Sequence, residues 1–188
     1  MVLNLPNLLT LLRVAVIPLV LVLFYIQWPY ARQTACALFV LAAVTDWFDG
    51  WLARRLGQTS KFGAFLDPVA DKLLVAVCLV MLLEDRPGGI LAALVAVIIG
   101  REITISALRE WMAELGQRTS VAVGVLGKFK TGFQMTAIGL MLWGHPLLGI
   151  PIYDLGFGLL FIAAALTVYS MVEYLRAAWP FMREEHPL

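Results

Sequence analysis

The chain has 188 residues, of which 61% are hydrophobic and 14% are charged. Such a composition lies outside the range of soluble globular domains and excludes an ordinary water-soluble protein. The formal net charge of +1, without a basic run, argues against a nucleic-acid-binding surface.

Six apolar stretches follow one another, and each approaches the ~20 residues that a helix needs to cross a bilayer. They occupy residues 8–28, 35–53, 66–83, 90–108, 131–150 and 154–175. The sequence shows no linker or internal repeat. We therefore predict an all-α integral membrane bundle of six transmembrane helices, forming a single domain over residues 1–188.

The N-terminal segment has its own signals. Pro6 can open a helix, and residues 1–13 predict a short amphipathic helix along the membrane interface. A secretory signal peptide is disfavoured, because a basic N-terminal region and a small-residue cleavage site are missing and further spans follow.

Lys and Arg residues collect on one side of the predicted topology. The short loops and tail on that side hold Arg54, Arg55, Lys61, Arg109, Arg118, Lys128, Lys130, Arg176 and Arg183, whereas the opposite side offers Arg32 and Arg86. Because cytoplasmic loops are enriched in Lys and Arg, both termini are predicted to be cytoplasmic.

Four carboxylates stand in the middle of these apolar stretches. They are Asp46, Asp49, Asp67 and Asp71. The second and third helices are antiparallel, so the end of one meets the beginning of the next, and the two carboxylate pairs can face each other. Because four such charges would repel, two divalent cations are the expected partners, and oxygen-only ligands favour Mg²⁺ or Mn²⁺. This places the catalytic motif in residues 46–71.

Small residues interleave with the carboxylates. Gly50, Ala53 and Gly63 leave room for a bulky ligand, although helix packing also explains small residues in membrane helices. Arg54 beside the acids suits a phosphate ligand, and its alternative role is to extend to the interface.

A second set of polar residues lies in 100–116 and 127–134. Its cations are Arg101, Arg109, Arg118, Lys128 and Lys130. Because many cations near a metal site favour an anionic ligand, we interpret this set as a phosphate clamp. Glu102 and Arg109 lie on the same stripe of the predicted helix, so Glu102 could orient Arg109. Positive-inside bias is the alternative explanation for these cations.

The acidic segment fits the pattern D-x2-D-G-x2-A-R-x8-G-x3-D-x3-D without a mismatch, and it thereby resembles the CDP-alcohol phosphotransferase family. The resemblance implies a six-helix enzyme in the bacterial inner membrane that transfers a phosphatidyl group from CDP-diacylglycerol to an alcohol and releases CMP at the cytoplasmic face. It implies that the four aspartates hold two metals and that Asp71 is the general base. The implied CDP-lipid site consists of Asn7, Thr10, Arg13, Asp46, Asp49, Gly50, Ala53, Arg54, Ser60 and Gly63.

Several further segments extend this resemblance over nearly the whole chain, toward members that use glycerol 3-phosphate. They include residues 6–13, the segment A-L-R-E-W-M-A-E-L-G and the segment G-K-F-K-T. A sister enzyme that uses inositol phosphate, serine or phosphatidylglycerol is the principal alternative, and a cation transporter or a scaffold are lesser ones. A homodimer is plausible. Cys36 and Cys78 lack C-x-x-C spacing and are expected to be buried packing residues.

Overall fold

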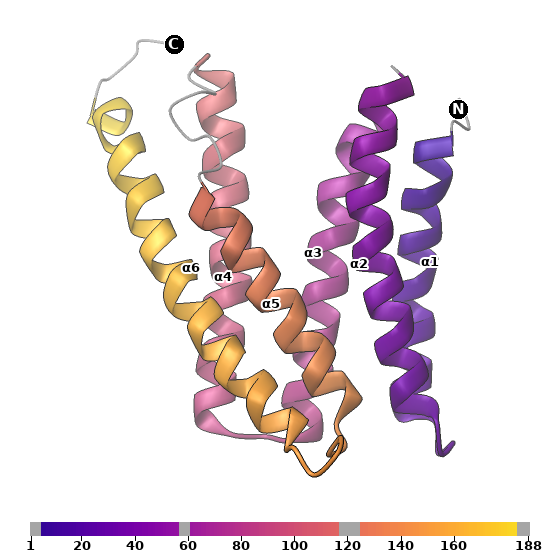
Figure 1. The fold of residues 1–188 in the computed structure, drawn as a ribbon. Helices are drawn as coiled ribbons and strands as arrows, with labels where there is room; N and C mark the ends of the chain where they lie inside the picture. The colour runs from indigo at the N-terminus through magenta and orange to yellow at the C-terminus, as the bar shows by residue number, and fades with distance from the viewer. Residues whose placement is uncertain (1–4, 57–60, 117–124, 184–188) are drawn as a thin grey trace. The chain divides into compact units, whose positions relative to one another are not determined.

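The computed structural model describes residues 5–56, 61–116 and 125–183. Within them the side chains of residues 5–7, 46–56, 61, 62, 64, 125–129 and 183 are not described. The regular structure within these ranges is helical, apart from one isolated bridge between Leu147 and Ile150, and short connections join the helices. Its helices are α1 (Leu5–Tyr25), α2 (Ala31–Leu56), α3 (Lys61–Asp85), α4 (Gly89–Glu114), α5 (Val125–Trp143) and α6 (Ile152–Arg183) (Figure 1).

Three of these helices are long and apolar enough to cross a membrane within the described residues. The qualifying segments are Leu8–Tyr25 in α1, Gly89–Glu114 in α4 and Ile152–Met182 in α6. A shorter apolar segment covers Ala31–Thr45 in α2. The all-helical prediction is therefore confirmed.

The chain divides into two compact units. The first unit comprises residues 1–87 and 135–157, and the second comprises residues 88–134 and 158–188. Helices α5 and α6 thus contribute one part to each unit.

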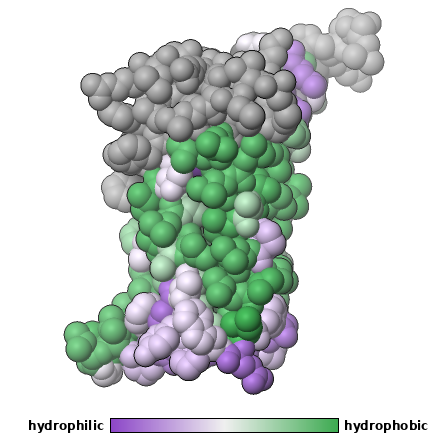
Figure 2. Space-filling view, turned by 90° about the vertical axis from the view of Figure 1, so that its right-hand side faces the viewer, coloured by the Kyte–Doolittle hydropathy of each residue, from purple (hydrophilic) through white to green (hydrophobic). Residues whose placement is uncertain are grey.

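In the first unit, α1 packs against both α2 and α3. The buried residues are mostly apolar and include Ala35 and Phe39 of α2 and Leu74, Leu79 and Leu82 of α3. Many large apolar side chains point outward instead: Leu12 is 57% exposed, and Leu41 is 60% exposed. Figure 2 shows an almost continuous apolar surface on the α1 side, with hydrophilic residues gathered at one end. Such a surface suits contact with lipid rather than water.

The second unit has its own core between α4 and the later part of α6. Buried Ile105, Leu108 and Met112 pack there with Tyr174 and Ala178. The members of α4 recur at spacings of three and four residues, so they form one stripe of the helix. This stripe brings the polar residues of α4 next to those of α6.

From Leu5 on, the segment predicted as an amphipathic helix over residues 1–13 is the first part of a longer helix. α1 runs without a break from Leu5 to Tyr25 and includes Pro18. Pro6 stands at the second position of the helix, where a missing N–H costs little.

The fifth apolar stretch also ends earlier than its hydropathy suggests. α5 finishes at Trp143, and residues 144–151 form a turn in which Gly144, Leu148 and Gly149 have positive φ angles. The backbone N–H of Leu147 donates to the carbonyl of Ile150 at 3.1 Å, and the reverse bond measures 2.9 Å. The glycines and prolines of this segment outweigh its hydropathy.

Candidate functional site

Two carboxylates of α3 face polar side chains of α1 in the first unit. The hydroxyl of Thr10 donates to Oδ1 of Asp67 at 2.5 Å, and Nη1 of Arg13 donates to Oδ1 of Asp71 at 2.8 Å. Thr10 and Arg13 are three residues apart on α1, and the two aspartates are four apart on α3. Each pair therefore lies on one face of its helix, and the two faces are turned toward each other.

This arrangement places charge in a largely apolar setting. The side chain of Arg13 is 1% exposed, whereas that of Asp71 is 35% exposed. A buried guanidinium needs an anionic partner, and Asp71 supplies one. The Asp71 side chain remains partly exposed, so Arg13 holds it in place without enclosing it.

The other two predicted metal ligands lie on α2. Asp46 and Asp49 belong to the helix Ala31–Leu56, but their side chains are outside the described residues. Among the described side chains, no group of three or more Asp, Glu, His or Cys residues could hold a metal. Asp67 and Asp71 are one turn apart and offer only oxygen donors, which is the donor chemistry that Mg²⁺ and Mn²⁺ prefer.

The remaining residues of the predicted CDP-lipid site are described in part. Gly63 is buried near the start of α3. Gly50, Ala53 and Arg54 belong to α2, and Asn7 belongs to α1, without described side chains. Ser60 lies outside the described residues altogether.

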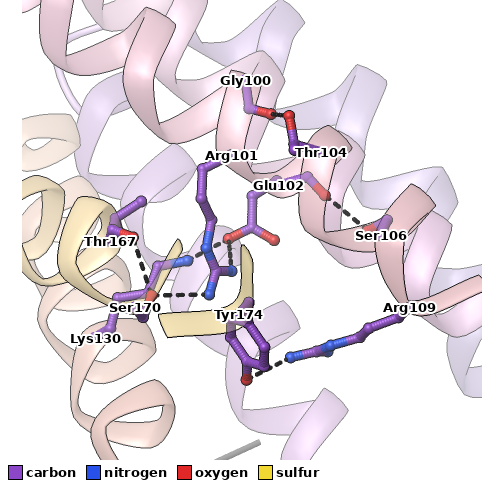
Figure 3. Close-up of polar contacts among 10 residues, drawn as sticks. All are labelled: Gly100, Arg101, Glu102, Thr104, Ser106, Arg109, Lys130, Thr167, Ser170 and Tyr174. Atoms are coloured by element: carbon purple, nitrogen blue, oxygen red, sulfur yellow. Dashed lines mark hydrogen bonds and ion pairs between the residues drawn. The ribbon is translucent and has the colours of Figure 1, made fainter. Parts of the chain in front are cut away.

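The second unit contains a buried ionic cluster in the predicted acceptor region (Figure 3). Nζ of Lys130 on α5 contacts Oε1 of Glu102, and Nη1 of Arg101 lies 3.2 Å from the same oxygen. Nη2 of Arg101 also donates to the hydroxyl of Ser170 on α6 at 3.1 Å. Three helices thus meet in one polar network, and the side chains of Arg101 and Lys130 are 7% and 3% exposed.

Arg109 extends this network toward the end of α4. Its Nη2 donates to the hydroxyl of Tyr174 at 2.9 Å, and its guanidinium carbon lies 5.1 Å from the centre of that ring. The hydrogen bond of Arg109 thus goes to Tyr174, while Glu102, which we expected to orient Arg109, contacts Arg101 and Lys130.

Of the predicted phosphate clamp, the structure brings together Arg101, Arg109 and Lys130. Arg118 lies outside the described residues, and the side chain of Lys128 is not described. Ser170 and Tyr174 were missed by sequence reasoning, since neither belongs to a charged motif. Their spacing of four residues on α6 was the one available signal.

Both cysteines are free and lack C-x-x-C spacing. Cys78 is buried, while Cys36 is half-buried and its Sγ donates to the carbonyl of Gly139 at 3.2 Å. These positions agree with packing roles.

The fold and its two polar clusters thus define a helical protein with long apolar helices and buried groups suited to phosphate chemistry. The family model for CDP-alcohol phosphatidyltransferases matches residues 3–172. The chain belongs to this family, and it is therefore a transferase enzyme.

Curated relatives match almost the whole chain. A protein of Salmonella choleraesuis (strain SC-B67) is 51% identical over 93% of this chain and 94% of its own length. A protein of Pseudomonas fluorescens is 49% identical over 97% and 93%, respectively. Both relatives are named CDP-diacylglycerol–glycerol-3-phosphate 3-phosphatidyltransferase.

Proposed function

We propose that this protein transfers the phosphatidyl group of CDP-diacylglycerol to glycerol 3-phosphate, giving phosphatidylglycerophosphate and CMP in phospholipid biosynthesis. The observation that carries this proposal is the identity of about one half, over nearly the full chain, with relatives that bear the name of this activity. The acidic motif and the cationic cluster are the parts of the chain that would perform it.

In the proposed reaction, a hydroxyl oxygen of the acceptor attacks the phosphorus of the phosphatidyl group. The new P–O bond forms as the P–O bond to CMP breaks, and the hydroxyl proton passes to a carboxylate oxygen of Asp71. Arg13 fixes that carboxylate at 2.8 Å and leaves part of it accessible. A carboxylate held in this way is a suitable general base.

Asp46, Asp49, Asp67 and Asp71 would together hold two divalent cations, Mg²⁺ or Mn²⁺. Such ions neutralise developing charge at the phosphates in transfer reactions. The contacts of Asp67 with Thr10 and of Asp71 with Arg13 are compatible with this role, because a carboxylate has about four acceptor positions. Asn7, Thr10, Arg13, Gly50, Ala53, Arg54, Ser60 and Gly63 would line the site for the CDP-lipid.

The cluster in the second unit fits an anionic acceptor. Arg101, Arg109 and Lys130 carry three positive charges and Glu102 carries one negative charge, which leaves two positive charges. A phosphate monoester carries about −1.5 to −2 at neutral pH, so it would compensate them. Serine and other acceptors without a phosphate would leave buried charge uncompensated. Arg118 and Lys128 are proposed to complete this clamp.

We further place the enzyme in the bacterial inner membrane as a single domain of six spans, with both termini and the active site on the cytoplasmic side. The three long apolar helices and the distribution of Lys and Arg support this topology.

The decisive experiment measures CMP release by the purified protein with CDP-diacylglycerol and Mg²⁺ or Mn²⁺. Glycerol 3-phosphate, inositol phosphate, serine and phosphatidylglycerol are supplied one at a time. We expect release with glycerol 3-phosphate alone, and loss of release with EDTA or in Asp71→Asn. Asp154→Asn, an exposed aspartate at the start of α6, is the matched control. Release with a different acceptor would reject the proposed substrate, and no release from folded protein would reject the activity.

A further inference from the structure

Two buried polar side chains of the second unit lie beside the ionic cluster. Gln134 is 4% exposed and Thr167 is 0% exposed. Within the described part of the chain, Oε1 of Gln134 and Oγ1 of Thr167 have no hydrogen-bond partner. Buried polar atoms are nearly always paired in folded proteins, so two such atoms near one cluster require an explanation.

The two side chains lie at the same level of the unit. Gln134 follows Lys130 by four residues on α5, so it lies on the same face, one turn farther along. Thr167 precedes Ser170 by three residues on α6, and the Ser170 hydroxyl donates to its carbonyl at 3.0 Å. α5 and α6 run in opposite directions (Figure 1). Moving forward along α5 from Lys130 to Gln134 and moving back along α6 from Ser170 to Thr167 therefore leads away from the ionic cluster in the same direction. The spacing therefore puts Gln134 and Thr167 each about one turn beyond Lys130 and Ser170, on the same side of the ionic cluster, and we infer that they form a polar layer there.

The hydroxyl of Thr167 differs from other helix hydroxyls of this molecule. Thr34, Thr45 and Thr104 each donate to the carbonyl four residues earlier, at 2.7 to 2.9 Å. This local bond is the ordinary way for a threonine to satisfy its hydroxyl in an apolar helix. Thr167 does not make it, which leaves its hydroxyl able to donate to another group.

The atoms of this layer are complementary to an alcohol. A hydroxyl group has one donor and two acceptor positions. Oε1 of Gln134 can accept its proton, and the hydroxyl of Thr167 can donate to its oxygen. One helical turn rises about 5.4 Å, a distance that an extended glycerol phosphate can span between a phosphate oxygen and its middle hydroxyl oxygen.

We propose that Gln134 and Thr167 bind the hydroxyl of the acceptor that does not react, while the neighbouring cations hold its phosphate. This inference rests on the proposed function and deepens it, since it assigns specificity-determining residues for the acceptor. The site would select a polyol phosphate over an alkyl phosphate that carries only the attacking hydroxyl.

The test compares glycerol 3-phosphate with 3-hydroxypropyl phosphate, which keeps the phosphate and the attacking hydroxyl but lacks the middle one. For the wild-type protein we expect kcat/KM to be about tenfold or more higher with glycerol 3-phosphate, because an acceptor without the hydroxyl leaves the buried groups unpaired. In Thr167→Val and Gln134→Met this ratio should fall by about three- to tenfold each.

The ratio separates recognition from structural damage. A variant that is merely less well packed loses activity with both acceptors and keeps the ratio. Thr104→Val, on an exposed face of α4, is the matched control and should keep the wild-type ratio. Thr167→Ser retains the hydroxyl and should restore most of the discrimination.

Equal kcat/KM values of the wild-type protein for the two acceptors would overturn this inference without recourse to any variant. An unchanged ratio in folded Thr167→Val and Gln134→Met would do the same. In either case CMP release with glycerol 3-phosphate would still support the proposed function. Absence of that release from folded wild-type protein would instead overturn both.

Discussion

At the scale of single residues, Arg13 links the first helix to the acidic motif. It is almost completely buried, and its guanidinium lies 2.8 Å from Asp71. A buried cation of this kind is costly unless it is paired, so its place on α1 and the place of Asp71 on α3 depend on each other. Thr10 makes a second link from the same face of α1 to Asp67.

We expect Arg13→Lys to lower kcat for CMP release by about 10- to 100-fold, since lysine keeps the charge but loses the planar fork that orients the carboxylate. The protein should still fold, because Asp71 keeps a cationic partner. Steady-state kinetics and thermal unfolding in detergent measure the two effects.

Arg86→Lys provides the control, because Arg86 is half-exposed and stacks on Tyr153 at 3.8 Å, at the other end of α3. It should leave kcat within about twofold, as surface substitutions generally do. Wild-type kcat in folded Arg13→Lys would contradict the positioning role.

Gly144 is a position where both the backbone and a neighbouring side chain favour glycine. Its φ angle is +71°, and a Cβ atom there would lie 2.8 Å from Nη1 of Arg32. Arg32 is itself held by Asp85 at 2.6 Å and by the ring of Phe24 at 4.7 Å, so it is not free to move away. Gly144→Ala should therefore reduce the free energy of unfolding by about 1–3 kcal/mol.

Thermal unfolding measures this loss, and Gly158→Ala is the comparison. Gly158 lies inside α6, and apart from the adjacent backbone of its own helix nothing described lies within 4 Å of where its Cβ would stand. Alanine there should be neutral or stabilising, because glycine weakens helix interiors by about 1 kcal/mol. Equal melting temperatures for the two variants would show that the Arg32 contact imposes no constraint.

At the scale of elements, the connection between α5 and α6 is a tight turn with one unfavourable residue. Leu148 has a φ angle of 53° and is followed by Gly149 at 81°. Two consecutive positive φ angles are typical of a turn that prefers Asn-Gly. The leucine side chain is 95% exposed, so packing gives no reason for its presence.

Leu148→Asn should stabilise the protein by about 0.5–1 kcal/mol, because asparagine tolerates the left-handed conformation better than leucine. Chemical or thermal unfolding of the two proteins in the same detergent measures the difference. A less stable Leu148→Asn protein would mean that the exposed leucine makes a favourable contact with detergent or lipid.

The sequence predicted the positions of the helices well and the side-chain contacts between them poorly. Hydropathy located all six helices, but it placed the end of the fourth at residue 108, whereas α4 continues to Glu114. The last turns of α4 are polar on one side, so they depart from the apolar pattern although the backbone remains helical. Hydropathy likewise extended the fifth stretch past Trp143, where the turn begins.

The candidate site was predictable as a set of residues but not as a set of contacts. Charged residues in apolar stretches identified Arg101, Asp67 and Asp71, since each is costly without a function. The partners Tyr174, Ser170 and Thr10 depend on how neighbouring helices are rotated about their axes. That rotation is not apparent from the hydropathy pattern of a single sequence, and uncharged side chains give little indication of it.

At the scale of the whole molecule, each unit buries its own cations. Arg13 lies in the first unit, and Arg101 and Lys130 lie in the second. Each group has a carboxylate partner within the same unit. The two proposed binding functions, for metal and CDP-lipid and for acceptor phosphate, therefore rest on separate networks, and substitutions in different networks should have nearly additive effects on stability.

The proposed metals should stabilise the molecule as a whole, because a ligand that binds only the folded state raises the free energy of unfolding by about 2.7 kcal/mol at 100 times its Kd. Saturating Mg²⁺ or Mn²⁺ should raise the melting temperature of the wild-type protein in detergent, and EDTA should reverse the rise. Asp67→Asn and Asp71→Asn remove ligand charge and should lose most of this shift, whereas Asp154→Asn should retain it. Because thermal unfolding requires no substrate, it separates metal binding from catalysis. Equal shifts in the wild-type protein and in both α3 variants would show that the stabilising ion binds elsewhere.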